Sequence, residues 1–170
     1  MKNVLLKVPV RIFFLLLFFP ASAIIAQQPA SMYYKVSVPE PSRQYYHVVL
    51  NCIVSDRNDI TLKMPGWTPG YYQLMHYADK VSNFKAYDKS GELKWQKPGD
   101  NSWKIELKPG KWQAFEISYD VEARRNFVAG NCVNEERAYL SPAGVFLYPE
   151  GMINNKVTVA VEPWSQWKKV

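Results

Sequence analysis

Residues 103–122 read WKIELKPGKWQAFEISYDVE, and this stretch decides the class of fold. Apolar residues occupy every second position in two runs, 103–107 and 115–121, and charged or small polar residues fill the positions between them. Successive side chains of a β-strand point to opposite faces, so each run has one apolar and one polar face. Pro109-Gly110 separates the runs and predicts a hairpin connection between two antiparallel strands.

The same alternation continues through most of the chain. It predicts further strands at 32–38, 46–54, 60–64, 84–87, 92–96, 144–148 and 157–161. In 46–54 both alternating sets are largely apolar, which predicts a central strand covered on both faces. The only helical spacing is a short one over 74–81. Strands about 8–12 residues apart with turns between them predict an all-β fold, a single-domain antiparallel β-sandwich.

The first 26 residues have the order of a secretory signal peptide. Three cations precede an unbroken apolar run over 12–19, and small residues follow at 21–23. We expect cleavage after Ala23 or Ala26, which leaves one domain over 27–170. The apolar run is shorter than the roughly 20 residues that span a bilayer. Export to the periplasm, the outer membrane or the medium is therefore expected, with a retained anchor or a buried N-terminal element as the alternatives.

The charge of the chain argues against a nucleic-acid partner. The sequence has 21 Lys and Arg against 15 Asp and Glu, a net charge of +6, but three of the cations lie within 1–26. The remaining excess is small and is spread along alternate, outward-facing strand positions. A nucleic-acid-binding domain gathers its basic residues on one face. We therefore expect no nucleic-acid partner.

Cys52 and Cys132 leave two alternatives open. In an oxidising compartment they could form a disulfide that closes a loop of about 80 residues, worth roughly 4–5 kcal/mol. Cys52 also fits a small buried thiol on a strand, which is the slightly favoured interpretation. The spacing alone does not show whether the two residues lie close enough to bond.

Residues that carry catalytic or metal chemistry are sparse. His47 and His76 are the only histidines, and the sequence contains neither a His-Glu-x-x-His nor a Cys-x-x-Cys motif. A zinc site built from the two histidines and the two cysteines is improbable, and His47 is better explained as a structural histidine on a strand. No Gly-x-Ser-x-Gly elbow or glycine-rich phosphate loop occurs. We therefore predict no catalytic residue, no metal ligand and no cofactor in this chain.

The segment 64–72, MPGWTPGYY, is the most informative part of the chain for function. Two prolines and two glycines predict a rigid, sharply turned loop that carries three aromatic rings. One interpretation is an aromatic wall at a cleft. The other, favoured because aromatic rings dominate cores, is a loop folded over the end of the sandwich with Trp67 filling the core. The candidate substrate-cleft or interdomain residues are Trp67, Pro69, Gly70, Tyr71 and Tyr72.

This loop and the segments around it resemble the N-terminal domain of the glycyl-aminopeptidase-like metallopeptidases, peptidase family M61. The family pattern P-x-W-x-P-G-S-Y is matched by Pro65, Trp67, Pro69, Gly70 and Tyr72. Further segments resemble the family in the same order: 33–39, 77–86, 119–121, 138–148 and 163–170. The resemblance covers 32–170. Tyr71 departs from the pattern, as do residues 75–76, where an Arg-acidic pair is common, and 124–134.

The resemblance implies a specific and limited role. In this family the β-domain precedes a zinc catalytic domain, which carries the His-Glu-x-x-His helix, and often a PDZ domain. Zinc is therefore expected only in the missing C-terminal catalytic domain of the same polypeptide. We expect this chain to pack on that domain and shape its cleft, meeting peptide substrate indirectly.

Two further questions stay open at this point. The segment 168–170 reads as the start of a strand, so we expect truncation at the C-terminal end, with a degenerate stand-alone relative as the alternative. The 6 Trp and 11 Tyr residues also motivate another function, a stand-alone glycan-binding, ligand-binding or structural β-sandwich module.

Overall fold

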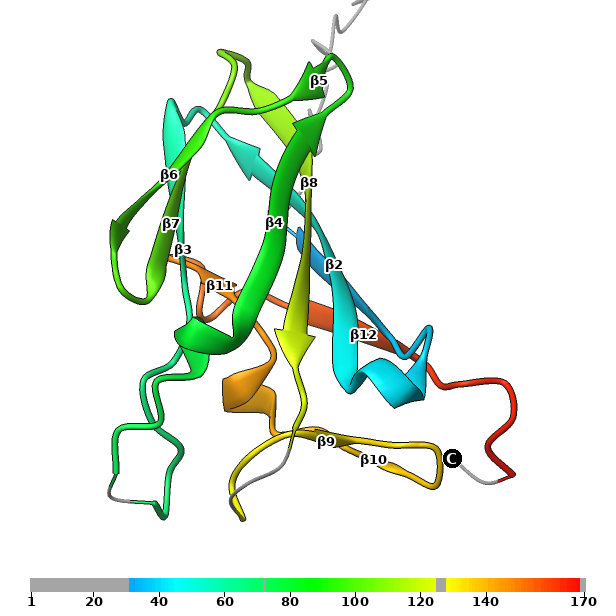
Figure 1. The fold of residues 1–170 in the computed structure, drawn as a ribbon. Coiled ribbons are helices and arrows are strands. Elements are labelled where there is room, and N and C mark those ends of the chain that lie inside the picture. The colour runs from blue at the N-terminus through cyan, green and yellow to red at the C-terminus, as the bar shows by residue number, and fades with distance from the viewer. Residues whose placement is uncertain (1–30, 72, 125–127, 169–170) are drawn as a thin grey trace, which may run out of the picture.

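The computed structural model describes residues 31–71, 73–124 and 128–168, which form two stacked β-sheets and a small hairpin (Figure 1). The predicted signal peptide lies outside the described residues. The strands are β1 (Ser31–Ser37), β2 (Tyr45–Ser55), β3 (Asp59–Lys63), β4 (Val81–Asp88), β5 (Gly91–Glu92), β6 (Trp95–Gly99), β7 (Ser102–Glu106), β8 (Trp112–Glu122), β9 (Cys132–Val133), β10 (Ala138–Tyr139), β11 (Tyr148–Pro149) and β12 (Val157–Glu162). Three short 3₁₀ helices are η1 (Pro41–Arg43), η2 (Tyr77–Lys80) and η3 (Pro142–Gly144). Among the described residues, no helix has the length and apolar character needed to cross a membrane.

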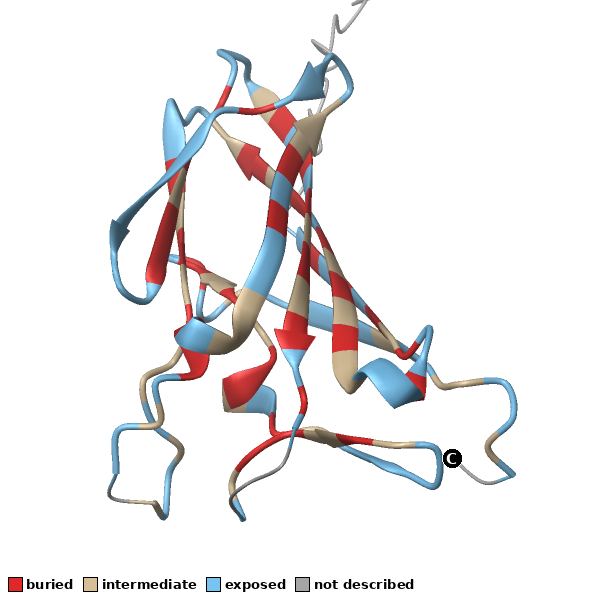
Figure 2. Ribbon diagram, viewed as in Figure 1, coloured by how far each residue is buried: buried red, intermediate tan, exposed pale blue. Residues whose placement is uncertain are grey.

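The larger sheet has the strand order β12-β1-β2-β8-β4-β5, and the smaller one has the order β11-β3-β7-β6. At the centre of the larger sheet, β2 pairs with β8 in antiparallel register from Tyr45 opposite Glu122 to Ser55 opposite Trp112. One alternating set of each strand is buried, including Leu50 and Ile117. Figure 2 shows this alternation as red bands along both strands. The predicted all-β sandwich is therefore confirmed.

The larger sheet is mixed, which corrects the expectation of purely antiparallel pairing. Strand β12 pairs with β1 in parallel, with Met32 opposite Val157 and Ser37 opposite Glu162. Hydrophobic alternation specifies which face of a strand is buried, but it carries no information about strand direction. The prediction for 46–54 was wrong in one respect as well, because only one face of β2 is buried and the other is partly exposed.

The predicted hairpin at Pro109-Gly110 is wrong. Strand β7 pairs with β3 and β6, whereas β8 pairs with β2 and β4, so residues 107–111 cross from one sheet to the other. The crossing is fixed by Gln113, whose Nε2 donates to the carbonyl oxygen of Lys108 at 2.7 Å. The backbone N–H of Leu107 also donates to the carbonyl oxygen of Asn58 at 2.8 Å. Pro109-Gly110 does lie in a connection between two strands, but the two strands belong to different sheets.

The predicted strand 144–148 is also wrong. Helix η3 ends at Gly144 and β11 begins only at Tyr148. Val145 and Leu147 are buried as in a strand, which explains the false signal. The Val145 N–H donates to the Pro142 carbonyl at 3.2 Å, and the other three backbone groups of these two residues bond to tyrosine hydroxyls instead of a neighbouring strand. The Tyr119 hydroxyl donates to the Val145 carbonyl at 2.9 Å and accepts the Leu147 N–H at 3.1 Å, and the Tyr34 hydroxyl donates to the Leu147 carbonyl at 2.6 Å.

Candidate functional site

The loop 64–76 follows β3 and projects from one end of the sandwich, the end at which β9 and β10 also lie (Figure 1). Both of its ends are fixed by hydrogen bonds. At its start, the Met64 N–H donates to the Asn101 carbonyl at 2.9 Å, and Asn101 Nδ2 donates to the Met64 carbonyl at 3.2 Å. At its end, the Met75 N–H donates to the Gly66 carbonyl at 2.9 Å. Met64 is fully buried and packs in the core.

The tip of this loop contains a tight turn over 68–71. The Tyr71 N–H donates to the Thr68 carbonyl at 3.0 Å, and Gly70 has φ of +83°. Proline at the second turn position and a positive φ at the third are the features of a type II turn. A residue with a Cβ is strained at such a φ, so Gly70 is required by the backbone conformation. The predicted rigid loop therefore has a local cause at Pro69 and Gly70.

A buried tyrosine attaches the loop to the core. Tyr77 is fully buried in η2, and its hydroxyl lies 2.8 Å from Thr68 Oγ1 and 3.3 Å from the carbonyl oxygen of Ala129, to which it donates. Gly144 of η3 lies directly against the Tyr77 ring, because a Cβ built on Gly144 would come within 2.8 Å of a ring carbon. The helical spacing over 74–81 gives no sign that Tyr77 anchors the loop.

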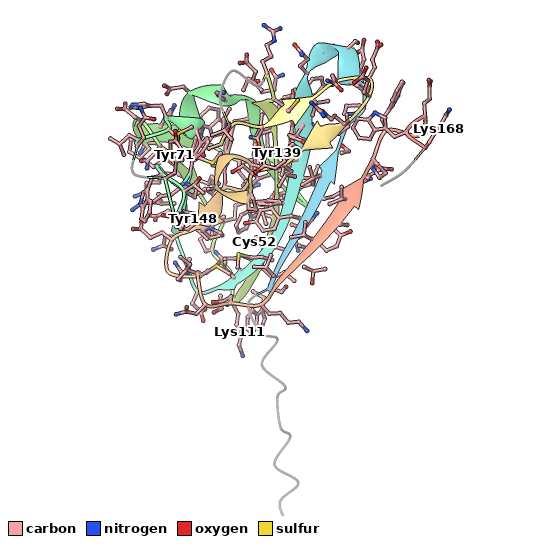
Figure 3. The ribbon with its side chains drawn as sticks, turned by 90° about the horizontal axis from the view of Figure 1, so that it is seen from below. Cys52, Tyr71, Lys111, Tyr139, Tyr148 and Lys168 are labelled. Atoms are coloured by element: carbon pink, nitrogen blue, oxygen red, sulfur yellow. The ribbon has the colours of Figure 1, made fainter. Side chains whose placement is uncertain are left out.

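Two large apolar side chains of the loop are exposed, beside the polar Gln73 and His76. Trp67 is 51% exposed and Leu74 is 68% exposed, while Tyr71 is half-buried. Figure 3 shows Tyr71 at one end of the molecule and Lys168 at the other. The favoured interpretation of Trp67 as a core residue is wrong, because its ring is exposed, whereas Met64 and Tyr77 before and after it are buried. Tyr72 lies outside the described residues, so the structure brings together Trp67, Pro69, Gly70 and Tyr71 of the predicted set.

The histidines have structural surroundings. His47 Nδ1 lies 2.7 Å from Asp120 Oδ1, and Asp120 Oδ2 accepts a hydrogen bond from Asn83 Nδ2 at 2.7 Å. This pairing across β2, β8 and β4 lies on the exposed side of the larger sheet, which fits the structural role expected for His47. His76 is exposed at the start of η2. In the ranges 31–71, 73–124 and 128–168, no three His, Cys, Asp or Glu side chains gather as metal ligands would.

The two cysteines are free thiols, Cys52 on β2 and Cys132 on β9. Cys52 is buried on β2, and burial raises the pKa of its thiol to about 12. Cys132 lies in β9, beside Tyr46, whose hydroxyl donates to the Cys132 carbonyl at 3.3 Å. Tyr46 and Cys52 stand six positions apart on β2, about 20 Å at the rise of a strand. The candidate disulfide is therefore not formed in this structure, and Cys52 is the buried strand thiol of the other interpretation.

Comparison with known proteins gives one family and a set of similar folds. The family described as the Peptidase M61 N-terminal domain matches residues 33–170. No curated protein matches the chain. The structure of an aminopeptidase N family protein from Idiomarina loihiensis is similar with a TM-score of 0.72 at 15% identity, over 78% of this chain and 22% of that chain. An M1 zinc metallopeptidase from Deinococcus radiodurans gives 0.41 at 13% identity, over 71% of this chain and 29% of that chain.

Proposed function

Because the chain belongs to the Peptidase M61 N-terminal domain family, we propose that it is the non-catalytic N-terminal β-domain of an exported zinc aminopeptidase. It packs on the catalytic domain and shapes the substrate cleft with the loop 64–76. The proposal places zinc in that catalytic domain. The chain spans about a fifth of the Idiomarina protein that shares its fold, which leaves room for such a domain in a relative of that size.

The observation that carries this proposal is the rigid presentation of apolar side chains on the loop. Trp67 and Leu74 are exposed, yet the backbone that bears them is fixed by Asn101, by the turn at Gly70 and by the bond from Thr68 to Tyr77. An exposed aromatic ring on a preorganised backbone loses little conformational entropy when it binds a partner.

The decisive experiment is kinetic. The chain alone should show no peptidase activity with or without added zinc. In the longer polypeptide that includes the catalytic domain, Trp67→Ala should raise KM for peptide substrates about tenfold or more while leaving kcat within about threefold. The matched control is Trp95→Ala, because Trp95 is also partly exposed but lies on β6. Zinc-dependent turnover by this chain alone, or equal kinetics of both variants, would refute the proposal.

Export is part of the proposal and has a separate test. The support is the order of cations, apolar run and small residues in 1–26. Intact-mass analysis of protein recovered from cells should show a mature N-terminus at Ile24 or Gln27. Recovery of the chain with Met1 from the cytosol would contradict export and would leave the peptidase proposal standing.

A second candidate function, glycan binding, is favoured by one hollow on the surface. Trp95, Glu92, Lys94 and Glu106 help to line a hollow of about 720 Å³. A partly exposed indole surrounded by charged side chains could stack on a sugar ring. Titration with a panel of soluble glycans should give no change in Trp fluorescence if the peptidase proposal is right. Saturable binding lost in Trp95→Ala would establish the glycan function instead.

A further inference from the structure

Strand β12 leaves an apolar row uncovered at one edge of the larger sheet. Val157, Val159 and Val161 are 45%, 46% and 59% exposed, and Figure 2 shows the strand pale blue along most of its length. Sequence alternation had predicted that these valines would face a dry interior. The structure corrects this, because all three valines are exposed.

The register of β12 shows which way the valines point. Val157, Val159 and Val161 pair in parallel with Met32, Tyr34 and Val36 of β1. Those three partners are buried, and paired residues of neighbouring strands project to the same face of a sheet. The valines therefore continue the core-facing surface of the larger sheet. They are exposed because no described strand of the smaller sheet extends over β12.

The free edge of β12 is also unlike the other free edges of the two described sheets. Strands β5 and β11 have two residues each, and β6 has Pro98 and a register shift between Gln96 and Gly99. Short strands, prolines and bulges are the devices by which proteins protect free edges. Strand β12 has six residues, no proline and an unbroken register. A long, regular and apolar free edge is therefore expected to be covered by another part of a protein.

We propose that the catalytic part of the parent polypeptide covers β12, so that the three valines (the valine row) form the interdomain contact. This inference rests on the proposed function and adds the surface that the domain uses. The occupant packs apolar side chains on the valine row and hides the free edge of β12. In this proposal the loop 64–76 contacts the substrate, and the valine row contacts the catalytic domain.

A tethered occupant fits these observations better than a second copy of this chain. Three valines supply only a fraction of the roughly 800 Å² per partner that a stable complex of separate chains buries. A domain joined a short distance after β12 is held at an effective concentration in the millimolar range. The chain after β12 also stays close to the β9–β10 hairpin, because Trp167 Nε1 donates to the Glu135 carbonyl at 2.9 Å. A small apolar contact is sufficient for a tethered partner.

The test compares β12 in the chain alone and in the longer polypeptide. Amide hydrogen exchange of 157–162 should be at least tenfold slower in the longer polypeptide. Val159→Lys should remove this difference and make the interdomain region more sensitive to limited proteolysis. Thr158→Lys is the matched control, since Thr158 is exposed on the opposite face of the same strand and receives the same charge. It should leave both measurements unchanged.

The outcomes separate this inference from the proposed function. Equal exchange of 157–162 in both forms, in a longer polypeptide that hydrolyses peptides with zinc, would overturn the valine-row contact and keep the peptidase proposal. A concentration-dependent dimer of this chain, abolished by Val159→Lys but not by Thr158→Lys, would overturn it in favour of a second copy. Slow exchange in a longer polypeptide that lacks peptidase activity would keep the contact and refute the enzymatic role.

Discussion

The central sheet and the irregular segment 128–149 are held by different kinds of hydrogen bond. In the sheet, β2 and β8 exchange backbone bonds along their whole length. The irregular segment has only the short pairings of β9 with β10 and of β11 with β3, and hydroxyl groups of inward-facing tyrosines on β1, β2, β8 and η2 bond to its backbone elsewhere; these tyrosines are Tyr34, Tyr46, Tyr77 and Tyr119. Any apolar side chain of suitable size maintains the first arrangement, whereas the second depends on particular hydroxyls. The two regions should therefore respond differently to the same mild substitution.

The largest effect is expected from the sheet core. Leu50→Ala removes a fully buried side chain from the centre of β2 and should lower the free energy of unfolding by about 3–4 kcal/mol. Urea denaturation measures this loss. Val49→Ala on the partly exposed face of the same strand is the control, and it should cost less than about 1.5 kcal/mol. Equal losses in the two variants would contradict the burial of one face.

Removing one hydroxyl should damage the irregular segment almost as much. Tyr119→Phe keeps the ring but leaves the Val145 carbonyl and the Leu147 N–H without their partner, at about 1–3 kcal/mol for each buried group. We expect a loss of about 2–3 kcal/mol and faster amide exchange at Leu147, with β2 still protected. Tyr33→Phe, at an exposed ring of β1, should change stability by less than about 0.5 kcal/mol. Uniform faster exchange in both regions would show that they do not differ as described.

The close contact between η3 and η2 offers a third test. Gly144→Ala places a Cβ against the Tyr77 ring, which is itself fully buried and cannot move freely. Overpacking of this kind costs about 1–3 kcal/mol. Because Tyr77 also bonds to Thr68, the substitution should loosen the loop 64–76, seen as faster proteolysis within it. Faster cleavage with unchanged thermal stability would still support this link, whereas no change in either would refute it.

Alkaline pH should lower the free energy of unfolding, because the tyrosine hydroxyls and the Cys52 thiol are buried. Burial raises the pKa of Tyr34, Tyr46 and Tyr119 above 10.0 and that of Cys52 from 9.0 to about 12. In the unfolded chain these groups ionise near their ordinary values, while in the folded chain they stay protonated. Stability is therefore complete below about pH 8 and falls as pH rises, by up to about 1.4 kcal/mol per pH unit for each group.

The contribution of Cys52 to this alkaline loss can be isolated. Cys52→Ala should flatten the stability curve between about pH 8 and pH 9, the interval in which the thiol of the unfolded chain ionises while its tyrosine hydroxyls stay largely protonated. Urea denaturation across that interval gives the slope, so the packing cost of the substitution does not interfere. An unchanged slope would show that the thiol is not protected from ionisation in the folded chain.

Sequence alone predicted the regular part of the fold and missed the irregular part for a physical reason. Alternation predicted β2, β7 and β8, because a strand with one buried face must repeat every two residues. It could not predict that residues 144–147 bond to Tyr119 and Tyr34, since a buried hydroxyl partner far along the chain leaves no periodic signal. It also could not predict the parallel direction of β12, which changes pairing but not alternation.

For the candidate site, sequence predicted the turn but not what the turn presents. Pro69 and Gly70 carry their conformational restriction locally, so the rigid loop followed from residue type. The exposure of Trp67 did not, because residue type does not show which aromatic ring of the segment is buried; in the structure Tyr77 is buried and Trp67 is exposed. Aromatic rings are buried on average, and the exposed one at this position is the informative exception.

The smallest expected effect tests whether the conformation of the loop tip matters apart from stability. Gly70→Ala places a Cβ at φ of +83°, where an L-residue costs about 1–2 kcal/mol, although nothing lies within 4 Å of the added atom. The strain should therefore act on the backbone of the turn alone, weakening the bond from the Tyr71 N–H to Thr68.

Gly66→Ala is the matched control, since Gly66 has no positive φ and only a van der Waals contact to Leu74. If the loop presents Trp67 to a substrate, Gly70→Ala should raise KM in the longer polypeptide severalfold at nearly unchanged kcat, and Gly66→Ala should not. Equal KM values in the two variants would mean that the turn positions nothing a substrate touches.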